Sequence, residues 1–197
     1  MDRRHRAGLN GARTSRRPTS QTTQATLSMS NSTPAIHDAP LPSDRSTSRR
    51  TLITFAAASF VLLSLGGWLT SLGMGTWYET LQKPWFQPPG WAFAPAWTTI
   101  LTLLAIASWQ VWLRAPSTSI RNLYAVQFVL NATWSLLFFT MESPLAALVE
   151  ILVLDAVVVI MTFVYGRVHA PAGWMVAPYA VWLLFATAIN VGVVALN

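Results

Sequence analysis

The chain has 197 residues, of which 53% are hydrophobic and only 10% are charged, with a formal net charge of +6. Soluble domains carry about 25% charged residues, so this composition indicates an integral membrane protein. The absence of cysteine excludes a disulfide framework, a cysteine-ligated metal site and a thiol nucleophile. The three histidines are scattered without metal-ligand spacing, so no metal site is expected.

The first fifty residues form a separate segment by composition. They hold nine of the thirteen basic residues, many Ser, Thr and Pro, and almost no large apolar side chains. Such a segment buries too little apolar surface to offset its ordering entropy, so residues 1–50 are predicted to be a disordered basic tail. An organellar transit peptide, or an over-extended start with Met29 as the true beginning, are the alternatives. Because the basic charge is confined to this tail, nucleic-acid binding is not expected.

From Thr51 onward the chain is dominated by apolar runs. Each is close to the roughly 20 residues that a helix needs to cross a bilayer, and glycine, proline and polar residues separate them. We therefore predict an all-α integral membrane domain over residues 51–197, with helices at about 51–73, 95–113, 121–141, 144–165 and 175–196.

The charges predict an orientation for this bundle. If the N-terminus is cytoplasmic, the inner segments hold twelve basic residues and the outer segments hold only Lys83. The positive-inside rule then places the N-terminus in the cytoplasm and the C-terminus outside. A bacterial inner membrane is the expected location, with an organellar or eukaryotic endomembrane as the alternative.

A loop rich in tryptophan and proline joins the first two predicted helices. Residues 77–91 read WYETLQKPWFQPPGW, and their prolines forbid a continuous helix. The segment is too aromatic for a solvated linker. A stiff aromatic loop beside a membrane is therefore interpreted as a lid over a flat apolar ligand.

Two predicted helices place tryptophan and asparagine on one face. Asn131 and Trp134 share a face of the third helix, and Trp182, Ala186 and Asn190 share a face of the fifth. Asparagine in hydrocarbon is costly without a partner, so both should face the bundle interior. They either hydrogen-bond between helices or line a cavity with Trp97, Trp134 and Trp182, and the spacing leaves both interpretations open.

The fourth predicted helix carries two acids, Glu150 and Asp155. Five residues separate them by about 140° around the helix axis, so they do not form a face-sharing carboxylate pair. Each is interpreted either as a structural hydrogen-bonding group or as a group for proton coupling.

Several motifs together resemble the translocator protein or tryptophan-rich sensory protein family (TspO/MBR, the peripheral-type benzodiazepine receptor family). The resemblance covers about residues 52–197 and rests on motifs in a fixed order: Trp77-Tyr78, Lys83-Pro84, Pro88-Pro89-Gly90-Trp91, Phe93, Pro95, Trp97, Gln127, Asn131 to Ser135, Phe138-Phe139, Pro178-Tyr179 with Trp182, Phe185 to Thr187, Asn190 and Leu196-Asn197.

This resemblance implies a five-helix bundle, commonly a homodimer, whose first loop caps a pocket. The family binds porphyrins, including haem and protoporphyrin IX, and isoquinoline-carboxamide or benzodiazepine-type drugs; animal members also bind cholesterol. By motif, Trp97 and Trp182 are the pocket tryptophans, joined by Tyr78, Asn131, Trp134 and Ala186. Some bacterial members degrade porphyrin in light, with these two tryptophans implicated.

The sequence departs from the family pattern in two places. The cholesterol motif of animal members ends the fifth helix with an aromatic residue and an arginine, whereas residues 190–197 contain neither. Sterol recognition at that site is therefore not expected. Ala94 also stands where the family often has glycine or proline before Pro95.

The expected function is binding of a porphyrin or haem-type tetrapyrrole by a membrane sensor, regulator or carrier, with no obligatory cofactor. Alternatives are a light-dependent porphyrin-degrading enzyme that uses Trp97 and Trp182, and a sterol or proton-coupled transporter that uses Asp155. Lys83 is expected either to pair with a propionate or to be solvated at the interface. The expected ligand-binding residues are Tyr78, Lys83, Trp97, Asn131, Trp134, Trp182, Ala186 and Asn190.

Overall fold

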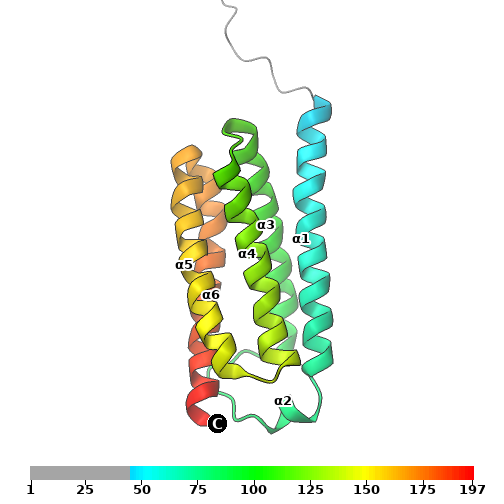
Figure 1. The fold of residues 1–197 in the computed structure, drawn as a ribbon, viewed down its shortest axis with the longest axis vertical. Helices are drawn as coiled ribbons and strands as arrows, with labels where there is room; N and C mark the ends of the chain where they lie inside the picture. The colour runs from blue at the N-terminus through cyan, green and yellow to red at the C-terminus, as the bar shows by residue number, and fades with distance from the viewer. Residues whose placement is uncertain (1–44) are drawn as a thin grey trace, which may run out of the picture. The chain divides into compact units, whose positions relative to one another are not determined.

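A computed structural model describes residues 45–197, and that part of the chain is helical throughout its regular structure (Figure 1). Five of its helices are long and apolar enough to cross a membrane, which confirms the predicted fold class. The long elements are α1 (Arg45–Gly73), α3 (Phe93–Arg114), α4 (Thr118–Ser135) with its π-helical continuation η2 (Leu136–Thr140), α5 (Pro144–Val168) and α6 (Ala170–Leu196). A short helix α2 (Thr76–Thr80) and a 3-10 turn η1 (Gly90–Ala92) lie between α1 and α3.

The first helix begins at Arg45 rather than at residue 51. Residues 45–50 therefore belong to α1, and the predicted tail boundary is wrong for them. The hydroxyl groups of Thr51 and Thr54 donate to the carbonyls of Thr47 and Arg50 in this extension, one turn earlier, so these polar side chains are satisfied by the helix itself. Residues 1–44 of the predicted tail lie outside the described residues.

The last two helices are also longer than the sequence predicted. The structure extends α5 to Val168 and begins α6 at Ala170, so only His169 separates them instead of the predicted break from residue 166 to 174. Pro171 is compatible with this start because the first turn of a helix needs no backbone donor. The glycines at 166 and 173 allow the close crossing, since a Cβ on Gly173 would stand 2.7 Å from the Cα of Gly166.

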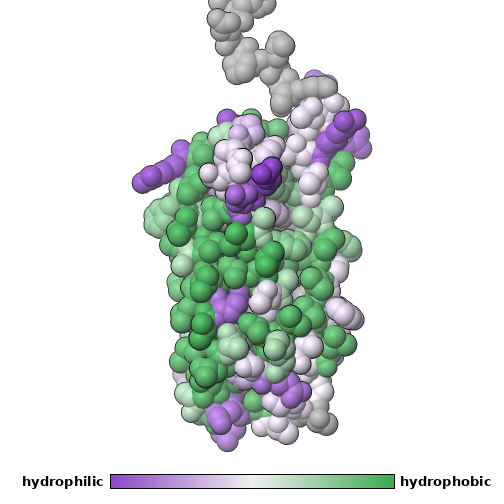
Figure 2. All heavy atoms as spheres, in the orientation of Figure 1, coloured by the Kyte–Doolittle hydropathy of each residue, from purple (hydrophilic) through white to green (hydrophobic). Residues whose placement is uncertain are grey.

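The five long helices form a ring whose order departs from the chain order at α3, which packs against α6 rather than against the next long helix, α4. Following the packed pairs, α1 contacts α3, α3 contacts α6, α6 contacts α5, α5 contacts α4, and α4 returns to α1. Figure 1 shows the long helices running up and down, with α2 and the C-terminus at the same end. Apolar residues cover most of the middle of the face seen in Figure 2, where one hydrophilic group is visible among them, and hydrophilic residues gather toward its two ends.

The end of the bundle that contains α2 is shaped by the π-helix η2. Its wider turn brings the backbone of Phe139 against α1, where Gly73 has no side chain to obstruct it. Phe138 is buried and stacks on Trp134 with ring centroids 5.1 Å apart. Trp77 and Tyr78 of the α1–α3 connection contact Phe138 and Phe139. The π-helix thus provides the aromatic surface on which this connection rests.

Candidate ligand-binding cavity

A cavity of about 760 Å³ lies inside the ring of helices, at the end that contains α2. All five long helices, η2 and the α1–α3 connection contribute to its wall. Its lining is mostly apolar and includes Leu62, Gly66, Gly67, Phe93, Trp97, Leu101, Asn131, Trp134, Ser135, Phe139, Ile151, Leu154, Trp182, Leu183 and Ala186.

Residues 74–89, which we call the lid, close one end of this cavity. Tyr78, Lys83, Gln87, Pro88 and Pro89 of the lid line it. Gln87 Nε2 donates to Tyr78 Oη at 3.1 Å, and Lys83 Nζ lies 4.0 Å from the centroid of the Tyr78 ring. The cation–π contact and the hydrogen bond hold the polar groups of the lid beside the cavity.

Trp97 and Trp182 meet on the α3–α6 side of the cavity. Their ring centroids are 6.4 Å apart with an interplanar angle of 79°, an edge-to-face arrangement. Phe93 contacts Trp182, and Tyr179 contacts Trp97. The structure therefore brings together the two tryptophans that the sequence motifs singled out, although they are 85 residues apart in the chain.

Trp134 lines the cavity on the α4 side, and Asn190 holds it there. Trp134 Nε1 donates to Asn190 Oδ1 at 3.1 Å, and Asn190 Nδ2 donates to the carbonyl of Pro144 at 2.9 Å. Asn190 is 1% exposed and does not belong to the cavity wall. Of the two interpretations left open for this residue, the structure favours hydrogen bonding between helices, because both groups of its amide bind neighbouring helices.

Asn131 combines both interpretations. It belongs to the cavity lining, and its Nδ2 donates to Tyr179 Oη at 2.7 Å. The Tyr179 hydroxyl in turn donates to Gln127 Oε1 at 3.3 Å. This hydrogen-bonded series joins α4 to α6 and presents a fixed polar group to a mostly apolar chamber.

The two acids of α5 lie near the cavity but do not line it. Ile151 and Leu154 occupy the α5 part of the wall. Asp155 Oδ2 accepts a hydrogen bond from Thr187 Oγ1 at 2.8 Å, whereas the carboxylate oxygens of Glu150 have no hydrogen-bond partner among the described residues. The geometry agrees with the structural interpretation of Asp155 and links Glu150 to no other charged group.

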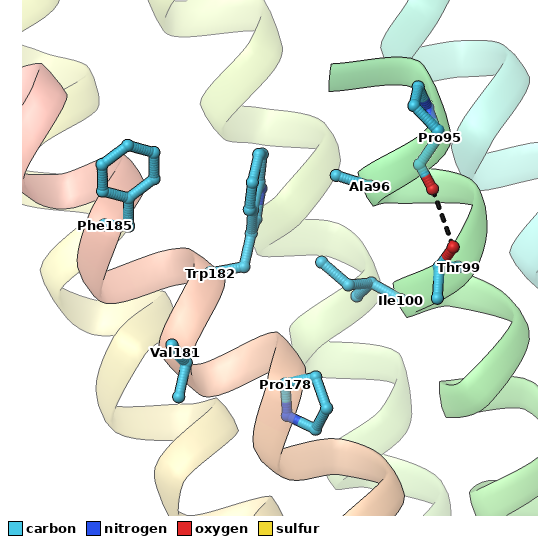
Figure 3. A pocket seen from close by; sticks show the side chains of 8 residues that line it. All are labelled: Pro95, Ala96, Thr99, Ile100, Pro178, Val181, Trp182 and Phe185. Atoms are coloured by element: carbon cyan, nitrogen blue, oxygen red, sulfur yellow. Dashed lines mark hydrogen bonds between the residues drawn. The ribbon is translucent and has the colours of Figure 1, made fainter. Parts of the chain in front are cut away.

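Trp182 also borders a second, shallower space on the outside of the bundle. This groove between α3 and α6 has a volume of about 520 Å³, and Pro95, Ala96, Thr99, Ile100, Pro178, Val181 and Phe185 complete its lining. Figure 3 shows the Trp182 ring rising from α6 into the space opposite Ala96 and Ile100 of α3. One indole therefore separates the inner cavity from the groove.

Several cavity residues were not among the predicted site residues. Phe93 and Phe139 were noted only as parts of motifs, and Gly66 and Gly67 were missed. Adjacent glycines inside an apolar helix, where each lowers the stability of the helix, are the signal that could have found them. Conversely, Trp85 and Trp91 of the aromatic loop are 94% and 76% exposed and lie outside the cavity wall.

Comparison with known proteins agrees with this architecture. The sequence model of the TspO/MBR family matches residues 53–196. The chain is similar to "Tryptophan-rich protein TspO" of Archaeoglobus fulgidus, with 36% identity over 74% of this chain and 98% of the relative. It is similar to "Translocator protein" of Bos taurus, with 35% identity over 68% of this chain and 85% of the relative. A third relative, "Tryptophan-rich sensory protein" of Cereibacter sphaeroides, is 31% identical over 74% of this chain and 90% of its own length. With its five spanning helices and its indole-lined chamber under a proline-rich loop, the chain belongs to the TspO/MBR family.

Proposed function

We propose that this protein binds a porphyrin or haem-type tetrapyrrole in the cavity and acts as a membrane sensor, regulator or carrier of that ligand. The observation that carries the proposal is the convergence of Trp97, Trp134 and Trp182, from three helices, on one chamber closed by the lid. The names of the relatives, a sensory protein and translocator proteins, fit such a role.

The size and lining of the chamber suit a flat aromatic guest. Ligand pockets commonly measure about 300–1,000 Å³, and 760 Å³ falls within this range. Each indole contact with a macrocycle contributes roughly 0.5–1.5 kcal/mol beyond the burial of apolar area. The indole Nε1 of Trp182 is buried and has no hydrogen-bond partner among the described residues.

Lys83 gives the chamber one positive group at its lid. A tetrapyrrole carries propionates, and an ammonium group beside the mouth would pair with one of them. Its contact with the Tyr78 ring fixes its position without neutralising its charge. Replacement of Lys83 by alanine should weaken protoporphyrin IX binding about three-fold, and Lys83→Arg should retain most of the affinity.

The central test is titration of the purified protein with protoporphyrin IX, followed by quenching of tryptophan fluorescence. We expect micromolar or tighter binding, and at least several-fold weaker binding for the double variant Trp97→Phe, Trp182→Phe. The matched control is Trp85→Phe with Trp91→Phe, which changes two exposed rings outside the cavity wall. Equal affinity for all three proteins would contradict the assignment of the cavity.

A second candidate function is light-dependent oxidation of the bound porphyrin by dioxygen. The edge-to-face pair of Trp97 and Trp182, with centroids 6.4 Å apart on the cavity wall, favours it because both rings would contact an excited ligand. Illumination should then remove the porphyrin absorption band and generate a new product. Bleaching at the rate seen without protein would reject this function.

The membrane setting and assembly are part of the same proposal. Arg45, Arg49, Arg50, Arg114, Arg121 and Arg167 lie at the end of the bundle opposite the lid. By the positive-inside rule this end faces the cytoplasm, which places the lid outside a bacterial inner membrane. On family resemblance we also propose a homodimer and binding of isoquinoline-carboxamide or benzodiazepine-type drugs. Crosslinking in membranes tests the first, and displacement of bound porphyrin tests the second.

A further inference from the structure

The lid is joined to the end of α6 by one side chain. The backbone N–H of Gln82 donates to Asn197 Oδ1 at 3.0 Å, and Asn197 Nδ2 donates to the backbone carbonyl of Gln82 at 3.0 Å. The same Nδ2 also donates to the carbonyl of Val193 at 2.8 Å, which orients the amide from the α6 side. Asn197 therefore pairs with the lid through both of its polar groups, as a neighbouring β-strand would.

Beyond the first residue of the lid, Met74, whose N–H bonds to the carbonyl of Thr70 in α1, these bonds have no polar substitute among residues 77–89. Within the described part of the chain, the other hydrogen bonds of residues 77–89 run to residues of the lid itself or to η1. The remaining attachments to the long helices and η2 are apolar. Ring contacts join Trp77 and Tyr78 to η2 and Phe86 to Phe185, and Pro84 is buried against Gly192.

Gly192 and Asn197 act on adjacent points of the lid. A Cβ placed on Gly192 would stand 2.9 Å from both Cβ and Cγ of Pro84, so only glycine permits this contact. Gln82 bonds to Asn197 two residues before Pro84 reaches Gly192. The last turns of α6 therefore hold residues 82–84, and Lys83, which lines the cavity, lies between the two held positions.

We propose that Asn197 is a positioning residue that latches the lid closed over the cavity, and that release of this latch is required for ligand exchange. The required release during ligand exchange rests on the proposed binding function, whereas the latch itself does not. Asn197 is not part of the cavity wall, so loss of its side chain changes the rates of ligand entry and exit without removing a ligand contact.

The first test needs no ligand. The Gln82 amide should exchange its hydrogen about three- to ten-fold faster in Asn197→Ala, because its N–H loses its acceptor, a bond of ordinary net strength. Asn122→Ala, an exposed asparagine on α4 at the opposite end of the bundle, is the matched control and should not change this exchange. Unchanged exchange at Gln82 in Asn197→Ala would overturn the latch.

The second test measures protoporphyrin IX kinetics by stopped flow. We expect association and dissociation each to be about three- to ten-fold faster in Asn197→Ala, with a smaller change in the equilibrium constant. Faster hydrogen exchange with unchanged porphyrin rates would overturn the required role in exchange, and would indicate a route between helices. If the native protein does not bind protoporphyrin IX, the proposed function fails, the required role in exchange falls with it, and the hydrogen-exchange result alone decides the latch.

A covalent lock tests the proposal in the opposite direction. The chain has no cysteine, so Pro84→Cys with Gly192→Cys introduces the only two thiols. An ideal Cβ at position 192 stands 2.9 Å from the Cβ of Pro84, closer than the 3.5–4.5 Å of a disulfide, so the lid must shift outward by roughly 1 Å for the bond to form. The oxidised protein should exchange porphyrin at least ten-fold more slowly than the reduced protein. Equal rates before and after reduction would show that the lid need not open.

Discussion

The two ends of the helix bundle are built in different ways. At the end with the arginines, side chains fill the interior: Val111, Tyr165 and Ala172 are fully buried, and α5 and α6 cross at a pair of glycines. At the other end the same helices surround a cavity, and a π-helix and the lid close it. The comparison indicates that the helices pack closely at one end and leave room at the other, where the proposed ligand site lies.

The largest expected effect on stability comes from a substitution that disrupts packing at the filled end. Gly173→Ala places a Cβ 2.7 Å from the Cα of Gly166 and 3.1 Å from the carbonyl oxygen of Thr162. Because backbone cannot yield easily, we expect a loss of about 3 kcal/mol in unfolding free energy, measured by denaturant titration in detergent. The affinity of the remaining folded protein for protoporphyrin IX should be unchanged.

The matched control for this change is Gly67→Ala. A Cβ on Gly67 meets no atom within 4 Å, so this substitution in a helix should stabilise the protein by about 0.5–1 kcal/mol. A similar loss of stability in both variants would show that the two ends do not differ in packing.

A smaller effect is expected from Asn190→Ala at the hollow end. This variant leaves Trp134 Nε1 and the carbonyl of Pro144 without their partner, at a cost of about 2 kcal/mol. Porphyrin affinity should fall as well, because Trp134 loses its fixed orientation. Asn190→Asp keeps the acceptor for Trp134 and should bind porphyrin more tightly than Asn190→Ala. Equal porphyrin affinities for the two variants would contradict the positioning role of Asn190.

The smallest effect is expected from Tyr165→Phe, which removes only the contact between the Tyr165 and Ser108 hydroxyl groups, 3.1 Å apart. Hydrogen bonds between spanning helices contribute about 0.6 kcal/mol on average. The melting temperature should fall slightly, with no change in porphyrin binding. A change in affinity would mean that the filled end communicates with the cavity.

The sequence predicted the spanning helices because twenty-residue apolar runs have few other structural solutions in a membrane. It did not predict where polar residues would extend a helix, as at Arg45, or where two helices would meet with one residue between them, as at His169. These boundaries depend on tertiary contacts such as the approach of Gly166 and Gly173.

The candidate site was predicted in part. Face periodicity and motifs located Trp97, Trp134, Trp182 and Asn131, all of which line the cavity. The same periodicity could not tell that Asn190 faces its neighbours, because a helix face is wide enough to serve both a wall and an adjoining helix. The π-helix was also not predicted, since its extra residue leaves no local signature in LLFFT.

That extra residue has a consequence for the evolution of the chain. Deletion of one residue between 136 and 140 would replace the wider π-helical turn with a tighter α-helical turn, and the backbone of Phe139 would no longer reach α1 in the same way. Phe139 would then lose its contact with the Tyr78 ring, and the lid would lose part of the aromatic surface against which it packs. The length of this five-residue segment should therefore tolerate change far less than the identity of its individual side chains.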